Sequence, residues 1–149
     1  MSGNSTPQFC ANGNFGTPKD VVAANTSSQG VGTIGTNMSL LLTAGANGSY
    51  VEYVRIMPTS SVPSTTMAGT VIRIFASVLT AGTTTSADTH LIAEVAMSAV
   101  TANSPTAANV PYDIPLLFRL PANWALHATT HVAAAANTSW KCLAVAGDY

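Results

Sequence analysis

Thr70-Val-Ile-Arg-Ile-Phe-Ala-Ser-Val-Leu79 is the stretch of sequence that most clearly indicates the fold. β-Branched and aromatic residues dominate it, which is typical of a strand in a pleated sheet. Side chains two positions apart share one face of a strand. One face therefore carries the apolar set Ile72, Ile74, Ala76 and Val78, and the other carries the mixed set Val71, Arg73, Phe75 and Ser77. We expect the mixed face to contact a partner.

Similar runs lie on both sides of this stretch, at fairly even spacing and separated by turn residues. This pattern indicates an all-β sandwich or barrel of about eight strands. At 149 residues the chain suits one domain. The seven strands expected from residue 37 onward are Asn37–Thr43, Ser49–Met57, Thr70–Leu79, His90–Ala99, Val110–Leu117, Ala125–Val132 and Trp140–Val145.

Two features of the first strands predict their pairing and their faces. Ala46-Asn47-Gly48 joins the first two runs, and Asn-Gly supplies the positive φ angles of a type I′ turn, so we expect a hairpin there. In the second run, strict alternation places Glu52 on the same face as Val54 and Ile56. Neither face of that strand is purely polar, which again suits contact with a partner.

Prolines and lysines indicate where the sheet edges lie. Pro111, Pro115 and Pro121 punctuate the fifth run, and proline lacks the donor that a central strand needs. We expect this strand to lie at an edge or to carry a bulge. Lys19 and Lys141 are the two lysines of the chain, so the edge strands lack the lysines that commonly prevent pairing with another chain. Edge pairing with another subunit is therefore plausible.

Residues 1–35 differ from the rest in composition. They are rich in Gly, Asn, Ser and Thr, and Phe9 and Phe15 stand isolated among them. Val21–Ala24 is the one apolar patch able to pair as a first strand, and the remainder offers little surface to bury. We expect residues 1–35 to form an extended N-terminal arm that orders against a partner, followed by a β-sandwich domain over residues 36–149.

The composition predicts a surface that is covered by other subunits. Five Lys and Arg residues and six Asp and Glu residues give a net charge of -1, while 47% of the residues are apolar. An ordinary soluble domain is about a quarter charged, and a nearly uncharged surface offers little repulsion against self-association. No membrane-spanning run and no basic stripe for direct binding of nucleic acid are present. Without an N-terminal signal sequence, we expect a cytosolic product with both cysteines, Cys10 and Cys142, reduced.

Two motifs that could suggest a cofactor or a metal site lack the structure or spacing that such sites need. Gly30-Val-Gly-Thr-Ile-Gly35 matches a dinucleotide fingerprint, but that motif needs a following helix, and the next residues read as a strand. His127 and His131 share a strand face, yet positions four apart on a strand are roughly 13 Å apart. Zinc binds nitrogen ligands at about 2 Å, so His127 and His131 of one chain cannot bind the same ion. We expect no metal and no cofactor.

Catalysis also lacks support in the sequence. No spacing favours any pair among the carboxylates of Glu52, Asp88, Glu94, Asp113 and Asp148. Glu52 and Glu94 lie in strand patterns and are expected to pair with arginines such as Arg55, Arg73 or Arg119. We therefore do not expect an enzyme.

The strand half of the chain resembles small β-sandwich structural proteins of tailed-bacteriophage virions, most of all the head decoration or cement proteins. The resemblance covers roughly residues 35–149. It rests on the blocks Gly48–Ile56, Thr70–Phe75, Pro115–Leu126 and Gly147–Tyr149. It implies a jelly-roll-like sandwich that forms a homotrimer on the outer capsid surface, assembled in the host cytoplasm. It also implies that neighbouring major capsid subunits are bridged.

Two functions therefore stay open. The first is a capsid decoration or cement protein that clamps major capsid subunits. The alternative is a receptor- or carbohydrate-binding sandwich of a phage tail or fibre, in which Trp124 or Trp140 stacks on sugar. The candidate interaction residues are Phe9, Phe15, Tyr53, Arg73, Phe75, Trp124 and Trp140.

Overall fold

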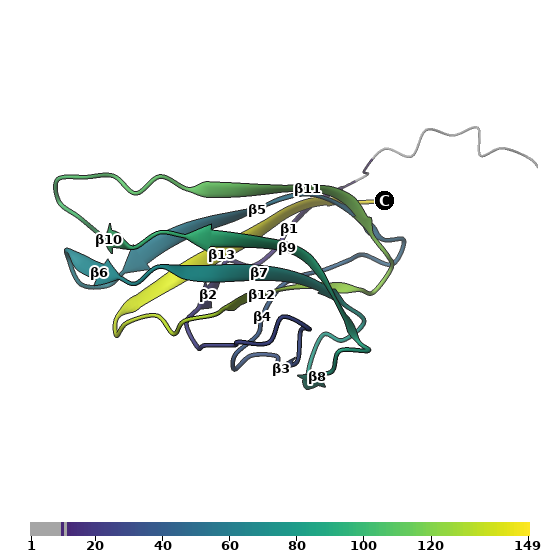
Figure 1. Ribbon diagram of the computed structural model, residues 1–149. Helices are drawn as coiled ribbons and strands as arrows, with labels where there is room; N and C mark the ends of the chain where they lie inside the picture. The colour runs from purple at the N-terminus through teal and green to yellow at the C-terminus, as the bar shows by residue number, and fades with distance from the viewer. Residues whose placement is uncertain (1–9, 11) are drawn as a thin grey trace, which may run out of the picture.

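The computed structural model describes Cys10 and residues 12–149 (Figure 1). Two antiparallel sheets face each other, so the fold is the expected all-β sandwich. Sheet I has the order β1-β13-β5-β11, and β2 also pairs with β13. Its strands are β1 (Asn12–Phe15), β2 (Lys19–Val21), β5 (Ser49–Ser60), β11 (Tyr112–Leu120) and β13 (Thr138–Asp148).

Sheet II has the order β4-β12-β7-β9. Its strands are β4 (Ser39–Thr43), β7 (Thr70–Ser77), β9 (Thr89–Met97) and β12 (Ala125–Thr130). Two short ribbons complete the described fold, with β3 (Gly32–Thr33) paired to β8 (Thr83–Thr84) and β6 (Thr65–Met67) paired to β10 (Val100–Ala102). The seven strands expected from residue 37 onward correspond to β4, β5, β7, β9, β11, β12 and β13, with differences of a few residues at their ends.

The chain crosses between the two sheets repeatedly. It passes from β4 in sheet II to β5 in sheet I, then to β7 and β9 in sheet II, and continues to β11, β12 and β13, changing sheet at each step. The predicted hairpin at Asn47-Gly48 is therefore wrong, because β4 pairs with β12 and not with β5. Gly48 has a φ of 92° and Asn47 does not have a positive φ, so the type I′ geometry is absent. The crossing turn lets Leu42 and Val51 enter the same core from opposite sheets.

A β-bulge at Glu52 corrects the alternation expected in β5. On one side, Val145 pairs with Tyr53 and Ala146 pairs with Val51, so Glu52 is the extra residue. The bulge shifts the pleat by one position. Val51 and Val54 consequently both face the core, and the exposed Glu52 does not share the face of Val54.

Strand β11 is the outer strand of sheet I, as its prolines predict. It also carries a bulge, because the register shifts between Pro115 and Phe118. Leu117 lies inside this bulge with a φ of 52°, a left-handed conformation that a leucine rarely adopts. Both alternatives expected for this strand, an edge position and a bulge, are confirmed.

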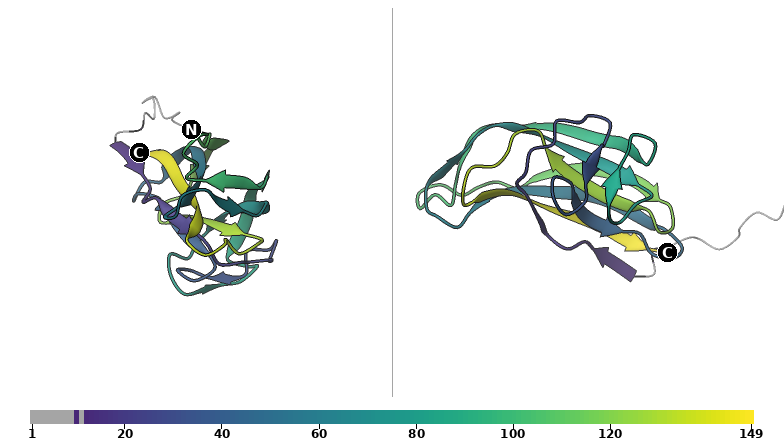
Figure 2. Two further views of the ribbon diagram at one scale, coloured as in Figure 1. Left: turned by 90° about the vertical axis from the view of Figure 1, so that its left-hand side faces the viewer. Right: turned by 90° about the horizontal axis from the view of Figure 1, so that it is seen from below.

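A segment of the N-terminal region covers the outer face of sheet II (Figure 2). The hydroxyl of Thr84 donates to the carbonyl of Gly30 at 2.6 Å and accepts from the amide of Gly32 at 3.0 Å. The Asn25 amide donates to the Thr130 carbonyl at 2.7 Å. These bonds order a segment with few apolar side chains. We call residues 24–38 the covering segment.

The covering segment overturns two expectations. Phe75 lies beneath it with 0% exposure, so the mixed face of β7 is buried within this chain and is not open to a partner. The expectation that residues 1–35 order against a partner is also wrong for the described part. Residues 12–15 and 19–21 pair with β13, and the covering segment packs on sheet II. Phe9 lies outside the described residues.

Arg73 is likewise buried, at 7% exposure, and not available as a contact residue. Its Nε lies 3.2 Å from a carboxylate oxygen of Glu94 on the neighbouring strand β9. Its Nη1 lies 3.2 Å from Nδ1 of His131. The prediction that Glu94 pairs with an arginine is confirmed, and the pair joins β7 to β9.

His127 lies on the same covered face and should make stability depend on pH. Burial lowers the pKa of His127 below its usual 6.5, and a hydrogen bond of Nε2 to the Leu79 carbonyl opposes that shift. Around and below pH 6.5 the unfolded chain therefore binds a proton at this position more readily than the folded chain does. As the pH is lowered below 6.5, we expect the free energy of unfolding to decrease by up to about 1.4 kcal/mol per pH unit.

Urea unfolding at a series of pH values between about 7 and 5 measures this effect. His127→Gln, which keeps a donor for Leu79, should flatten the dependence, and His90→Gln at an exposed position is the control. An equally steep dependence in His127→Gln would show that another group is responsible.

Candidate interaction face on sheet I

The outer face of sheet I remains open, and it brings two of the predicted contact residues together. Register pairs Phe15 of β1 with Val145 of β13, Val145 with Tyr53 of β5, and Tyr53 with Pro115 of β11. Residues opposite one another in antiparallel strands point to the same side. These four side chains therefore form one apolar row across the sheet, in which Phe15 is 71% exposed, Tyr53 is half-buried and Val145 is buried at 8% exposure. We call this the aromatic row.

The next row along the sheet contains an ion pair that neutralises its own charge. Leu143 pairs with Arg55, and Arg55 pairs with Asp113. The guanidinium donates through Nε and Nη2 to the two oxygens of Asp113, each at 2.8 Å. These bonds lower the pKa of Asp113 and raise that of Arg55. Arg55 also lies 5.5 Å from the ring centre of Tyr53, so it joins the two rows.

Hydrogen bonds at the end of the sheet hold β1, and hence Phe15, in place. The Asn14 side chain donates to a carboxylate oxygen of Asp148 at 2.7 Å, and the Ser49 hydroxyl donates to the same oxygen. Asn14 also donates to the Thr43 carbonyl at 3.2 Å. A strand of four residues is thus tied to β13 and to the end of β4, and Asp148 links it in turn to Ser49 of β5.

Arg119 lies near the end of β11, at the edge of this face. Its guanidinium carbon lies 4.6 Å from the ring centre of Tyr149, and its Nη2 donates to the Asn47 carbonyl at 3.2 Å. Arg55 and Arg119 are thus both engaged within the chain. The face is therefore largely apolar and aromatic, and its two arginines are engaged within the chain, while the exposed Glu52 in the bulge of β5 adds a carboxylate. Such a composition suits a broad contact with another protein surface.

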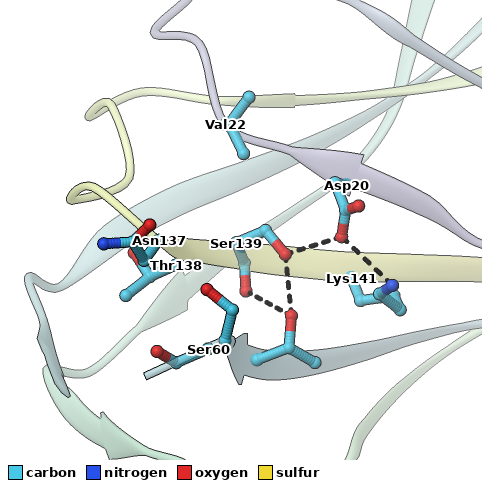
Figure 3. Close-up of a pocket in the computed structure, with 9 residues that line it drawn as sticks. Asp20, Val22, Ser60, Asn137, Thr138, Ser139 and Lys141 are labelled. Carbon is cyan, nitrogen blue, oxygen red and sulfur yellow. Dashed lines mark hydrogen bonds and ion pairs between the residues drawn. The ribbon is translucent and has the colours of Figure 1, made fainter. Parts of the chain in front are cut away.

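A polar hollow of about 420 Å³ lies beside this face, where β2 meets β13 (Figure 3). The Ser139 hydroxyl donates to Asp20 at 2.6 Å and lies 2.7 Å from the Thr59 hydroxyl, and Lys141 lies 3.3 Å from Asp20. The bond from Ser139 lowers the pKa of Asp20; burial opposes this shift and Lys141 adds to it. These groups satisfy one another, so the arrangement fastens β2 to sheet I.

The two tryptophans do not join the interaction face. Trp140 is 2% exposed and pairs with Pro58 inside the sandwich, so it is wrong as a contact residue. Trp124 is half-buried and stacks on His90, with ring centres 6.1 Å apart and planes inclined by 8°. Of the seven candidate residues, Phe15 and Tyr53 come together, whereas Arg73, Phe75, Trp124 and Trp140 lie elsewhere.

The sequence did not single out Val145, Leu143 or the Arg55–Asp113 pair. Alternation assigns Arg55 to the face of Tyr53, but the partner of Arg55 depends on which strands are neighbours. In the described part of the chain, no group of three His, Cys, Asp or Glu side chains could hold a metal ion. Both cysteines are free, and burial raises the pKa of Cys142 to about 12. Its thiol is therefore unreactive at neutral pH.

Comparison of the chain with family models, curated proteins and solved structures gave no match. Over the described residues there is also no helix with the length and apolar character needed to cross a membrane.

Proposed function

We propose that the protein is a structural virion protein that decorates the outer capsid surface. In this role it oligomerises and clamps neighbouring major capsid subunits, which stabilises the head. The role requires no catalytic step and no cofactor. It requires a rigid scaffold, exposed surfaces that bind other proteins, and more than one contact for each assembled unit.

The strand order supports this proposal at the level of the scaffold. The sheets β1-β13-β5-β11 and β4-β12-β7-β9, between which the chain passes at every step from β4 to β13 except from β7 to β9, support a jelly-roll-like arrangement. Capsid and lectin domains both use such double-sheet sandwiches. Because one fold serves many functions, the scaffold narrows the choice without deciding it.

The aromatic row carries the proposal. Two aromatic residues from different strands, the exposed Phe15 and the half-buried Tyr53, share a face whose arginines are engaged inside the chain. Contact residues that contribute most of the binding energy are often aromatic. Because the arginines of this face are engaged, it gains little from long-range attraction to an acidic partner, and its binding should depend mainly on apolar contact.

Replacing both Phe15 and Tyr53 by serine should weaken attachment to capsids by roughly 100-fold, about tenfold for each lost aromatic contact. Co-sedimentation with heads of the parent virus that lack this protein measures the effect. Val132→Ser removes a side chain that is 42% exposed elsewhere and serves as the control. Unchanged attachment of the double variant, with the control behaving like the wild type, would remove the aromatic row from the binding surface.

The stacked pair of Trp124 and His90 favours a second candidate function, namely binding of a receptor or carbohydrate. A half-buried indole leaves part of its ring open, and such rings bind sugars by stacking. Because Trp140 is buried, Trp124 is the one of the two tryptophans that is available for this role. A change in tryptophan fluorescence on addition of glycans would favour this function, and no change would count against it.

A further inference from the structure

One side of the sandwich exposes part of its core. The outer strands β9 and β11 lie along this side and contact each other across the two sheets (Figure 1). Side chains from both strands pack against the core but stay half-buried, among them Val95, Met97, Leu116 and Phe118. Further apolar side chains on and beside the same strands are exposed, namely Leu91, Ile92, Val110, Tyr112 and Leu117. We call this surface the open side.

The chain closes the opposite side by itself. There β2 contacts β4, and the Ser39 hydroxyl donates to the Asp20 carbonyl at 3.2 Å. Val21 and Leu42 are buried at 2% and 3% exposure. Gly16 passes so close that an added Cβ would lie 2.1 Å from the Leu41 carbonyl oxygen. Exposure of half-buried core residues is thus a property of the open side and not of sandwich edges in general.

The backbone of β9 is suited to pairing with another strand. It runs for nine residues as the last strand of sheet II, and it contains neither proline nor lysine. Its one carboxylate, Glu94, is already held by Arg73. Soluble proteins usually protect an edge strand with charge, proline or a cover. Both strands of the open side have a register shift, β9 at Ile92 and β11 between Pro115 and Phe118. Because β11 also contains Pro115, which has no backbone donor, β9 offers the edge with more backbone groups for pairing.

The size and charge of the open side fit a second copy of the chain. A strand of nine residues is about 30 Å long, and two sheets about 10 Å apart with their flanking side chains give a width of roughly 20 Å. The area, about 600 Å² per copy, approaches the ~800 Å² that each partner buries in a standard interface. Asp113 and Glu94 both have arginine partners, so the surface offers no net charge to attract a charged protein. An identical uncharged surface is complementary to it.

We propose that the open side is the self-association surface, at which copies of this chain pack β9 and β11 against one another about a shared symmetry axis. The inference rests on the proposed function only in requiring several copies in one clamp. It leaves the aromatic row, on a different face, available for the capsid. A closed assembly of this kind covers the exposed core residues and the edge of β9 together.

Light scattering of the full chain tests the inference with the variant Ile92→Lys/Leu117→Asp. Both positions lie on the open side, and the left-handed φ of Leu117 is better tolerated by aspartate than by leucine, so the fold should persist. We expect the wild type to have a multiple of the monomer mass of 15.2 kDa. The variant should dissociate with a dissociation constant about 100-fold higher, tenfold for each apolar contact replaced by charge.

Val132→Lys is the matched control, because Val132 is 42% exposed and Ile92 is 37% exposed. It introduces the same lysine as Ile92→Lys, but away from the open side, and should keep the wild-type mass. Hydrogen exchange of the wild type gives a readout without mutation: β9 amides should gain protection as protein concentration rises. A monomeric wild type, an unchanged mass in the double variant, or equal dissociation of Val132→Lys would each overturn the inference.

Capsid co-sedimentation of the same samples separates this inference from the proposed function. A wild type that is monomeric yet sediments with capsids would refute self-association through the open side and leave the decoration role standing. A wild type that associates through the open side but ignores capsids would do the reverse.

Discussion

Trp140→Ala is expected to lower the free energy of unfolding by about 3–5 kcal/mol, the usual range for removing a large buried aromatic side chain. Trp140 is 2% exposed and belongs to the core cluster between the sheets. No neighbouring element can collapse freely into the space, because β13 is held on one side by β5 and on the other by β2. A typical domain has only 5–15 kcal/mol of stability in total, so the variant should unfold at a much lower denaturant concentration.

Urea unfolding followed by circular dichroism measures this loss for each monomer at matched protein concentration. Trp124→Ala is the control, since Trp124 is half-buried and should lose clearly less. Equal stability of Trp140→Ala and the wild type would mean that Trp140 is exposed. It would also restore Trp140 as a possible platform for sugar.

Phe75→Ala is the second substitution for which we expect a loss of about 3–5 kcal/mol. Phe75 fills the space between sheet II and the covering segment, and a Cβ added at Gly30 would lie 3.0 Å from its ring. Removing the ring takes away the largest apolar contact beneath a segment that is otherwise held by hydrogen bonds from Asn25 and Thr84. The covering segment should therefore open locally before the sandwich unfolds.

Hydrogen exchange identifies this second effect. Amides of residues 24–38 should lose protection in Phe75→Ala, whereas those of β13 should keep the protection that global stability allows. Val78→Ala, at a position that is 47% exposed close to Phe75 in the sequence, should change neither. Wild-type protection of the covering segment in Phe75→Ala would mean that its hydrogen bonds suffice without the ring.

The strands could be predicted from the sequence because their signals are local. Runs such as Thr70–Ser77 are rich in β-branched residues, and turn residues bound them, so strand positions follow from composition and spacing. The edge position of β11 followed from its prolines, since a missing donor is tolerated only where no neighbour requires it. The pairing of Glu94 with an arginine could also be predicted, because the chain has only five Lys and Arg residues.

The sheet partners and faces could not be predicted, because they depend on contacts distant in sequence. Asn47-Gly48 has the local chemistry of a hairpin, yet the two strands that it joins belong to different sheets. One extra residue at Glu52 moves Val51 to the core, and alternation alone cannot reveal a bulge. The aromatic row combines Phe15 and Tyr53 only through the register of β1, β13 and β5.

The covering segment is the clearest case of a tertiary effect that composition conceals. Residues 24–38 contain few large apolar side chains, which is typical of an arm that does not order by itself. They order because Asn25 and Thr84 make specific hydrogen bonds and because packing on sheet II buries the apolar ring of Phe75. The covering segment buries Phe75, and Glu94 and His131 engage the buried Arg73, so neither residue is available to a partner as the sequence had predicted.

Binding of the wild-type protein to parent-virus heads that lack it, measured by co-sedimentation over a range of salt, tests the central claim most directly. We predict saturable binding that changes little between about 0.05 M and 0.5 M salt, because the arginines of the aromatic row's face are engaged inside the chain. Absence of saturable binding at any salt concentration would contradict the assembly role, and binding abolished by salt would contradict an apolar contact surface.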